Sequence, residues 1–183
     1  MSKIQEAIDN MSVAEMKERL ATYMAADKEW APKPIAIEVR HRDTKDVSGS
    51  NIYDIIAILD NDTEVPIKFR HRNSMVLYVY TLMHPNGYKR ASLDKRDKGF
   101  PELASLYNTL FMSNPKRLIE QAEKDYNHLF SMAAADIHKT IGRHIGLEEL
   151  TFDSPRQHND RTLIPAVKNG LQVNFDRQLS LAI

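Results

Sequence analysis

The sequence changes its periodicity within residues 67–85, IKFRHRNSMVLYVYTLMHP. Up to Arg70 these residues continue a β pattern, whereas from Ser74 onward the apolar residues recur at helical spacing. The expected apolar face of this helix consists of Met75, Val76, Val79, Leu82 and Met83. The segment HPNG (84–87) ends the helix, because proline and glycine favour a turn. A strand followed directly by an apolar helix is therefore the starting point for the fold.

Three β segments lie in and before this stretch: 35–41 (IAIEVRH), 52–59 (IYDIIAIL) and 65–70 (VPIKFR). The connections between them, DTKDVSGS and DNDTE, are polar and typical of turns. Because these connections leave no room for crossover helices, the sequence predicts an antiparallel meander rather than a parallel sheet.

The first 31 residues are predicted to be a separate helical segment. Ser12 and Glu15 have the spacing of a capping box, and apolar residues follow at helical spacing up to Met24. The expected amphipathic helix runs from about Ser12 to Lys28 and is stopped by Pro32-Lys33-Pro34, because proline cannot continue an incoming helix. We therefore expect two parts, an N-terminal helical segment (1–31) and a larger domain (32–183).

Three further helices and a hairpin are expected after the first apolar helix. The helices cover about 101–111, 115–130 and 133–145, and Asn114 is the expected N-cap of the second. The stretch RTLIPAVKNGLQVNF (161–175) has alternating runs on both sides of Asn169-Gly170, which is typical of a two-residue β-hairpin turn. The predicted fold class is α+β.

With this order of elements, residues 60–177 resemble the winged-helix output domains of OmpR/PhoB-type response regulators. The resemblance rests on the segments IKFRHRNSMVLYVYTLMHP, ADIHKTIGRHI (135–145) and RTLIPAVKNGLQVNF. It implies a winged helix-turn-helix with a small N-terminal antiparallel sheet, in which the third helix enters the major groove of DNA and the hairpin forms the wing. A receiver domain is not expected, because the roughly 60 preceding residues are too few for a domain of that type.

The helix 133–145 is the expected DNA reader. Ala134, Ile137, Ile141 and Ile145 form a stripe that is expected to face the core. Lys139, Thr140 and Arg143 are then expected on the outer side, where a Lys/Arg pair one turn apart can contact phosphates or base edges. A solvated helix face is the alternative. With the hairpin, the predicted DNA contacts are Lys139, Thr140, Arg143, Arg161, Lys168 and Asn169.

A basic stretch between Lys68 and Lys98 is a second candidate for phosphate contacts. It holds eight basic and two acidic residues, a net charge of +6. Its predicted anion contacts are Arg70, Arg72, Lys89 and Arg90. The tripeptides RHR at 40–42 and 70–72 would add a four-arginine anion site if their strands were neighbours, or otherwise form polar ends of edge strands.

Composition limits the classes of function. The 25 basic and 25 acidic residues cancel, which does not favour a strong non-specific nucleic-acid binder. The absence of cysteine excludes disulfides and thiolate metal sites. There is no signal peptide and no run of about 20 apolar residues, so no membrane contact and a cytoplasmic location are expected.

No nucleotide-binding or nucleophile motif occurs, and the histidines lack metal-ligand spacing, so we expect no enzyme, no metal and no cofactor. The leading hypothesis is a transcriptional regulator or accessory factor that binds double-stranded DNA. The alternative is a protein-interaction or scaffolding module, whose N-terminal helix pairs with a partner or with a second copy of the chain. An exposed apolar patch on the recognition surface or on the N-terminal helix would favour the alternative.

Overall fold

The computed structural model describes residues 31–42, 52–89, 99–145, 147–153, 162–165 and 171–177, together with Ser12, Glu15 and Leu179. The chain divides into two units, Met1–Lys33 and Pro34–Ile183. In the first unit the predicted capping box is confirmed. Ser12 Oγ accepts a hydrogen bond from the Glu15 backbone N–H at 3.3 Å, and the Glu15 carboxylate accepts one from the Ser12 N–H at 2.9 Å. The remainder of the predicted helix lies outside the described residues.

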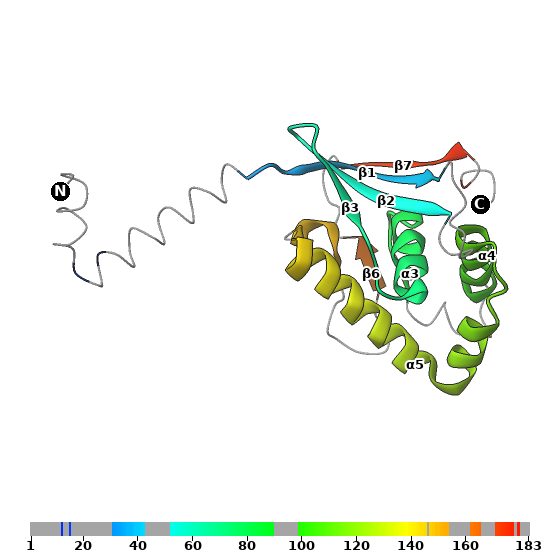
Figure 1. Cartoon of the computed structure of the whole chain (residues 1–183). Coiled ribbons are helices and arrows are strands. Elements are labelled where there is room, and N and C mark those ends of the chain that lie inside the picture. Colours follow the sequence, from blue (N-terminus) through cyan, green and yellow to red (C-terminus); the bar gives the residue numbers. More distant parts are fainter. Residues whose placement is uncertain are drawn as a thin grey trace. The chain divides into compact units, whose positions relative to one another are not determined.

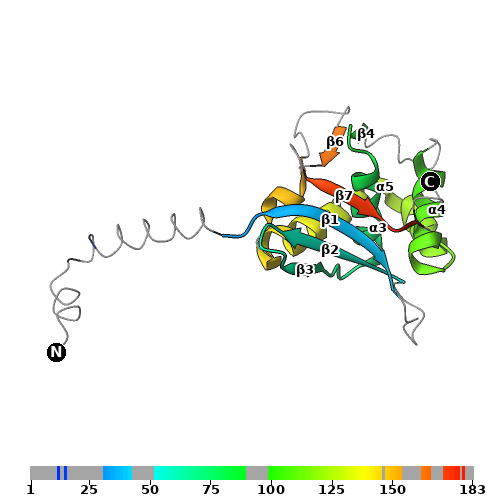
Figure 2. The same ribbon diagram turned by 90° about the horizontal axis from the view of Figure 1, so that it is seen from above.

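The second unit is a mixed α+β structure, as predicted. Its main sheet has the strand order β3-β2-β1-β7 (Figures 1 and 2). The strands are β1 (Pro34–His41), β2 (Tyr53–Leu59), β3 (Glu64–Ile67) and β7 (Gln172–Phe175). The first three form the predicted antiparallel meander, and β7 pairs in parallel with β1.

One face of this sheet packs on the helices. In β2, Tyr53, Ile55, Ala57 and Leu59 are buried and alternate with half-buried residues, as expected for a strand with one face toward the core. Ile37 of β1 pairs with Ala57 and is fully buried. Figure 1 shows the helices α3 (Arg72–Met83), α4 (Gly99–Phe111) and α5 (Lys116–His138) beneath this face.

The helix α3 is the centre of the core. All nine residues from Ser74 to Leu82 are buried, so the prediction of a single apolar face is wrong. Helices α4 and α5 flank α3 and the small strand β6 also contacts it, so every side of α3 meets protein. Tyr78 donates a hydrogen bond from its phenol to the backbone carbonyl of Leu150 at 2.8 Å, which joins α3 to the short helix η3 (Glu148–Leu150).

A second, three-stranded sheet has the order β4-β6-β5. Its strands are β4 (Tyr88–Lys89), β5 (Phe152–Asp153) and β6 (Thr162–Pro165). Both pairings are antiparallel, so β6 lies between its sequence neighbour β5 and the strand that connects α3 to α4.

The predicted β-hairpin at 161–175 is therefore wrong. Its two strands became β6 and β7, and these belong to different sheets. In β7, Val173 pairs with Ile37 of β1 and Phe175 pairs with Val39. The alternating apolar residues of β7 therefore lie beside the buried strand β1 and not beside β6. The turn residues Asn169 and Gly170 lie outside the described part of the chain.

Candidate functional site

The helix α5 contains a break that divides it in two. Asp125 has an extended backbone conformation (φ −157°, ψ 90°) within the helix. Its carboxylate accepts a hydrogen bond from the backbone N–H of His128, three residues later, at 2.9 Å. This is the geometry of an N-cap, so Asp125 ends the segment 116–124 and begins a new helical segment at 126. The predicted break between 130 and 133 is wrong, and the helix begins at Lys116, not at Pro115.

The second segment of α5 has a buried and an exposed face. Phe130, Ala133 and Ile137 are buried, and Ile141 is buried in the following π-helix η2 (Lys139–Ile145), which confirms the core positions of Ile137 and Ile141. The exposed side chains on the other side recur at spacings of one and three residues. We call them the α5 outer face: His128, Ser131, Met132, Ala135, His138 and Lys139.

Of the predicted DNA contacts that the structure describes, one lies on this face. Lys139 is exposed at its C-terminal end, as predicted. Thr140 is only 6% exposed, so its prediction as an outward-facing contact is wrong. Thr140 follows Ile137 by three residues and thus lies on the buried side of the next turn. Arg143 lies in η2, and Arg161, Lys168 and Asn169 lie outside the described residues.

The predicted phosphate contacts in the basic stretch are dispersed. The guanidinium carbon of Arg72 lies 5.0 Å from the centre of the Phe111 ring, a cation–π arrangement that engages its charge within the protein. Arg70 is exposed, Lys89 lies in β4, and Arg90 is outside the described residues.

The two RHR tripeptides do not form one anion site. The strand β2 separates β1 from β3, so their ends are not neighbours. Arg42 forms a bidentate pair with the carboxylate of Asp54. Arg40 bonds Glu64 and Glu38, and these contacts raise the pKa of its guanidinium. These arginines are therefore paired within the sheet.

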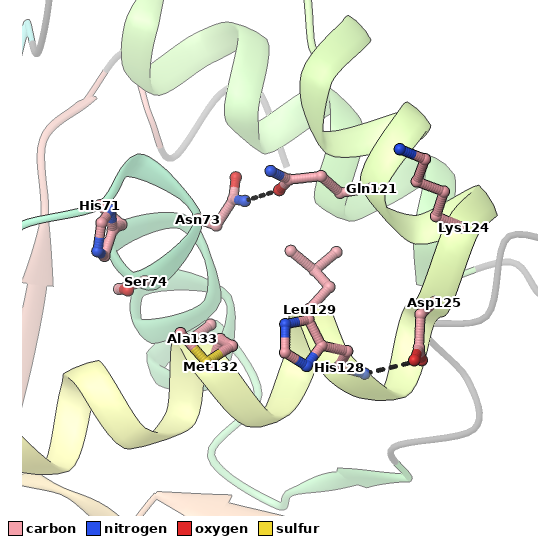
Figure 3. A pocket seen from close by; sticks show the side chains of 10 residues that line it. All are labelled: His71, Asn73, Ser74, Gln121, Lys124, Asp125, His128, Leu129, Met132 and Ala133. Atoms are coloured by element: carbon pink, nitrogen blue, oxygen red, sulfur yellow. Dashed lines mark hydrogen bonds between the residues drawn. The ribbon is translucent and has the colours of Figure 1, made fainter.

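A pocket of about 410 Å³ separates the start of α3 from α5. Its lining residues are His71, Asn73, Ser74, Gln121, Lys124, Asp125, His128, Leu129, Met132 and Ala133 (Figure 3). Figure 3 shows Asn73 and Gln121 pointing toward each other from the two helices; the Asn73 amide donates to Gln121 Oε1 at 2.8 Å. The pocket spans the break in α5, because it takes residues from both helical segments.

The starts of two helical segments meet at this pocket, and only one of them has an acidic side chain that offsets its partial positive charge. The segment that begins at 126 has the carboxylate of Asp125 as its cap. The start of α3 has no such group: its N-cap residue His71 makes no side-chain capping bond, and its first turn holds no acidic residue. A helix start carries a partial positive charge, so the α3 start favours an anion that the described residues do not supply.

A polar cluster lies at the opposite end of α3. Tyr80 donates a hydrogen bond to Glu102 at 3.2 Å, and its ring stacks on His84 at 4.2 Å between centroids. Burial raises the pKa of the Tyr80 phenol, and the charge and hydrogen bond of Glu102 raise it further. His84 in turn bonds the Tyr80 carbonyl oxygen at 2.8 Å, so the cluster closes the C-terminal end of α3.

The sequence reasoning missed both the pocket and the helix break that shapes it. The available signal was Asp125, a good N-cap residue inside a helical pattern. Among the described residues no group of histidine and acidic side chains could hold a metal ion. Within that same part of the chain, no helix is long and apolar enough to cross a bilayer. Searches of family models, curated proteins and solved structures find no match to the chain.

Proposed function

We propose that the chain is a winged-helix DNA-binding protein, a transcriptional regulator or accessory factor, that contacts double-stranded DNA through the α5 outer face. The observation that carries the proposal is the order and pairing of the elements. An antiparallel meander precedes the helices α3, α4 and α5, and the consecutive antiparallel strands β5 and β6 follow after the short helices η2 and η3. In this proposal the wing is formed by β5 and β6, so it shares only its second strand with the hairpin that the sequence predicted.

The dimensions and chemistry of the α5 outer face support this role. The segment 126–138 is about 20 Å long at 1.5 Å per residue, and the major groove accommodates one α-helix. None of the outer-face residues is acidic, and His128 and Lys139 carry hydrogen-bonding groups. Met132 and Ala135 between them are suited to contact with thymine methyl groups.

The experiment is a titration of a fluorescently labelled mixed-sequence duplex with the protein, followed by anisotropy at two salt concentrations. We expect binding at low salt that weakens as salt rises. The logarithm of the binding constant should fall against the logarithm of the salt concentration with a slope of about −0.9 per neutralised phosphate. An unchanged anisotropy at low salt and micromolar protein would remove the DNA-binding proposal.

One observation favours a second candidate, a protein-interaction module on the same surface. Met132 is 56% exposed at the centre of the α5 outer face, and the exposed Ala135 lies one helical turn from it, so the two give this face an apolar centre. If the duplex does not bind, this methionine marks the surface on which a protein partner should be sought.

A further inference from the structure

We propose that the pocket between α3 and α5 binds a small organic phosphate of about mononucleotide size. Its phosphate would lie at the start of α3, and its remaining part would pack on Leu129 and Met132. This inference differs from the DNA-binding proposal in its ligand, although His128 and Met132 line the pocket and also belong to the α5 outer face.

The size and lining of the pocket fit such a ligand. A volume of about 410 Å³ lies in the range of small-molecule sites, roughly 300–1,000 Å³. Leu129, Met132 and Ala133 form the apolar part of the wall, and the polar residues come from the two helix starts and from Gln121 and Lys124. An apolar wall with a few convergent polar groups is typical of small-molecule sites.

The charge distribution favours a phosphate. The uncapped start of α3 is an anion-binding feature, and no acidic side chain in its first turn competes for that place. Lys124 adds a cation from the other wall. The nearby carboxylate of Asp125 is already engaged by the backbone N–H of His128, so it acts as the cap of its own helix.

A buried hydroxyl at the same place is a second, independent observation. Ser74 lines the pocket, is fully buried, and its Oγ has no hydrogen-bond partner among the described residues. Buried polar groups are almost always hydrogen-bonded, so this hydroxyl calls for an explanation. A phosphate oxygen at the α3 start would supply the hydrogen-bond acceptor that this hydroxyl lacks.

The amide pair at the rim is suited to the remainder of the ligand. The bond from Asn73 to Gln121 uses one nitrogen and one oxygen. It leaves the Asn73 oxygen and the Gln121 nitrogen as an acceptor and a donor for a polar ring edge. A nucleoside 5′-monophosphate combines the phosphate, the polar edge and an apolar ring face.

The test is isothermal titration calorimetry on the full chain. The probes are the four common nucleoside 5′-monophosphates, the matching nucleosides and inorganic phosphate. We expect at least one monophosphate to bind about tenfold or more tightly than its nucleoside, because the phosphate supplies charged hydrogen bonds. Absence of binding by every monophosphate at millimolar concentration, or equal binding by the nucleoside, would overturn the proposal.

Two lysine variants locate the site. Lys124→Gln should weaken monophosphate binding about fivefold or more, whereas Lys116→Gln, the same change on the first turn of α5, should leave it unchanged. Equal affinities in both variants would place the ligand elsewhere and contradict the proposal. If a DNA duplex displaces the monophosphate and Lys124→Gln weakens duplex binding equally, the pocket holds a backbone phosphate, and the small-ligand proposal is wrong.

Discussion

The helices α3 and α5 differ in what surrounds them. Nine consecutive residues of α3 are buried, so its side chains pack against the protein on all sides of the helix. The second segment of α5 buries Phe130, Ala133 and Ile137 but leaves its outer face to solvent. A helix buried all round can tolerate little change, whereas a helix with one buried face has the other available for binding. The side chains of α3 therefore serve packing, whereas the surface proposed to bind DNA lies on α5.

The largest expected effect separates the two helices by stability. Leu82 of α3 is 4% exposed, and Met132 of α5 is 56% exposed. Leu82→Ala should lower the free energy of unfolding by about 2–5 kcal/mol, because it leaves a cavity in the core. Met132→Ala should change it by no more than about 0.5 kcal/mol. Urea denaturation of both variants measures the difference, and similar losses would contradict this distinction between the helices.

A pH effect should also originate in α3. Burial raises the pKa of the phenols of Tyr78 and Tyr80 above the ordinary value of about 10, and the charge of Glu102 adds to the shift of Tyr80. As pH rises past about 10, the unfolded chain therefore loses these protons before the folded protein does. Stability is full below that pH and falls above it by up to about 1.4 kcal/mol per pH unit for each tyrosine.

Urea denaturation between about pH 9 and pH 11 tests this linkage. Tyr80→Phe should reduce the dependence of the unfolding free energy on pH in this range, because it removes one of the phenols whose pKa is raised in the folded protein. An identical dependence in the variant and in the original chain would show that Tyr80 does not contribute.

A smaller effect should come from the break in α5. Asp125→Ala removes the side chain that accepts the His128 N–H, so the free energy of unfolding should fall by about 1 kcal/mol. Asp125→Asn is the matched control, because asparagine is an equally good N-cap and should retain most of the stability. If the asparagine variant loses as much as the alanine variant, Asp125 stabilises the fold by its charge and not as a cap.

The parts of the fold that depend on local patterns were predictable from the sequence. The meander follows from alternating residues and short polar turns, and α3 and α4 from helical spacing between turn signals. Long-range pairing was not predictable. The residues of β7 alternate as in a hairpin strand, but their partner is β1, more than 130 residues earlier in the chain. The alternation of apolar and polar residues identifies a strand but does not determine which strand it pairs with.

The candidate site was predicted only in part. Spacing placed Ile137 and Ile141 in the core and Lys139 outside, because one helical face is shared by residues three and four apart. The same rule, applied to the flank of the stripe, would have placed Thr140 beside Ile137. The pocket needs residues from α3 and α5 that are about 50 positions apart, so helix periodicity alone does not reveal it.

The central claim is that the α5 outer face binds DNA, and two glutamate substitutions test it most directly. Ala135→Glu adds a negative charge to that face, and Gln172→Glu adds one to an exposed position of β7 in the four-stranded sheet. In duplex anisotropy titrations at low salt, we expect Ala135→Glu to weaken binding about tenfold or more, and Gln172→Glu to leave it nearly unchanged. Equal affinities in the two variants would contradict the claim.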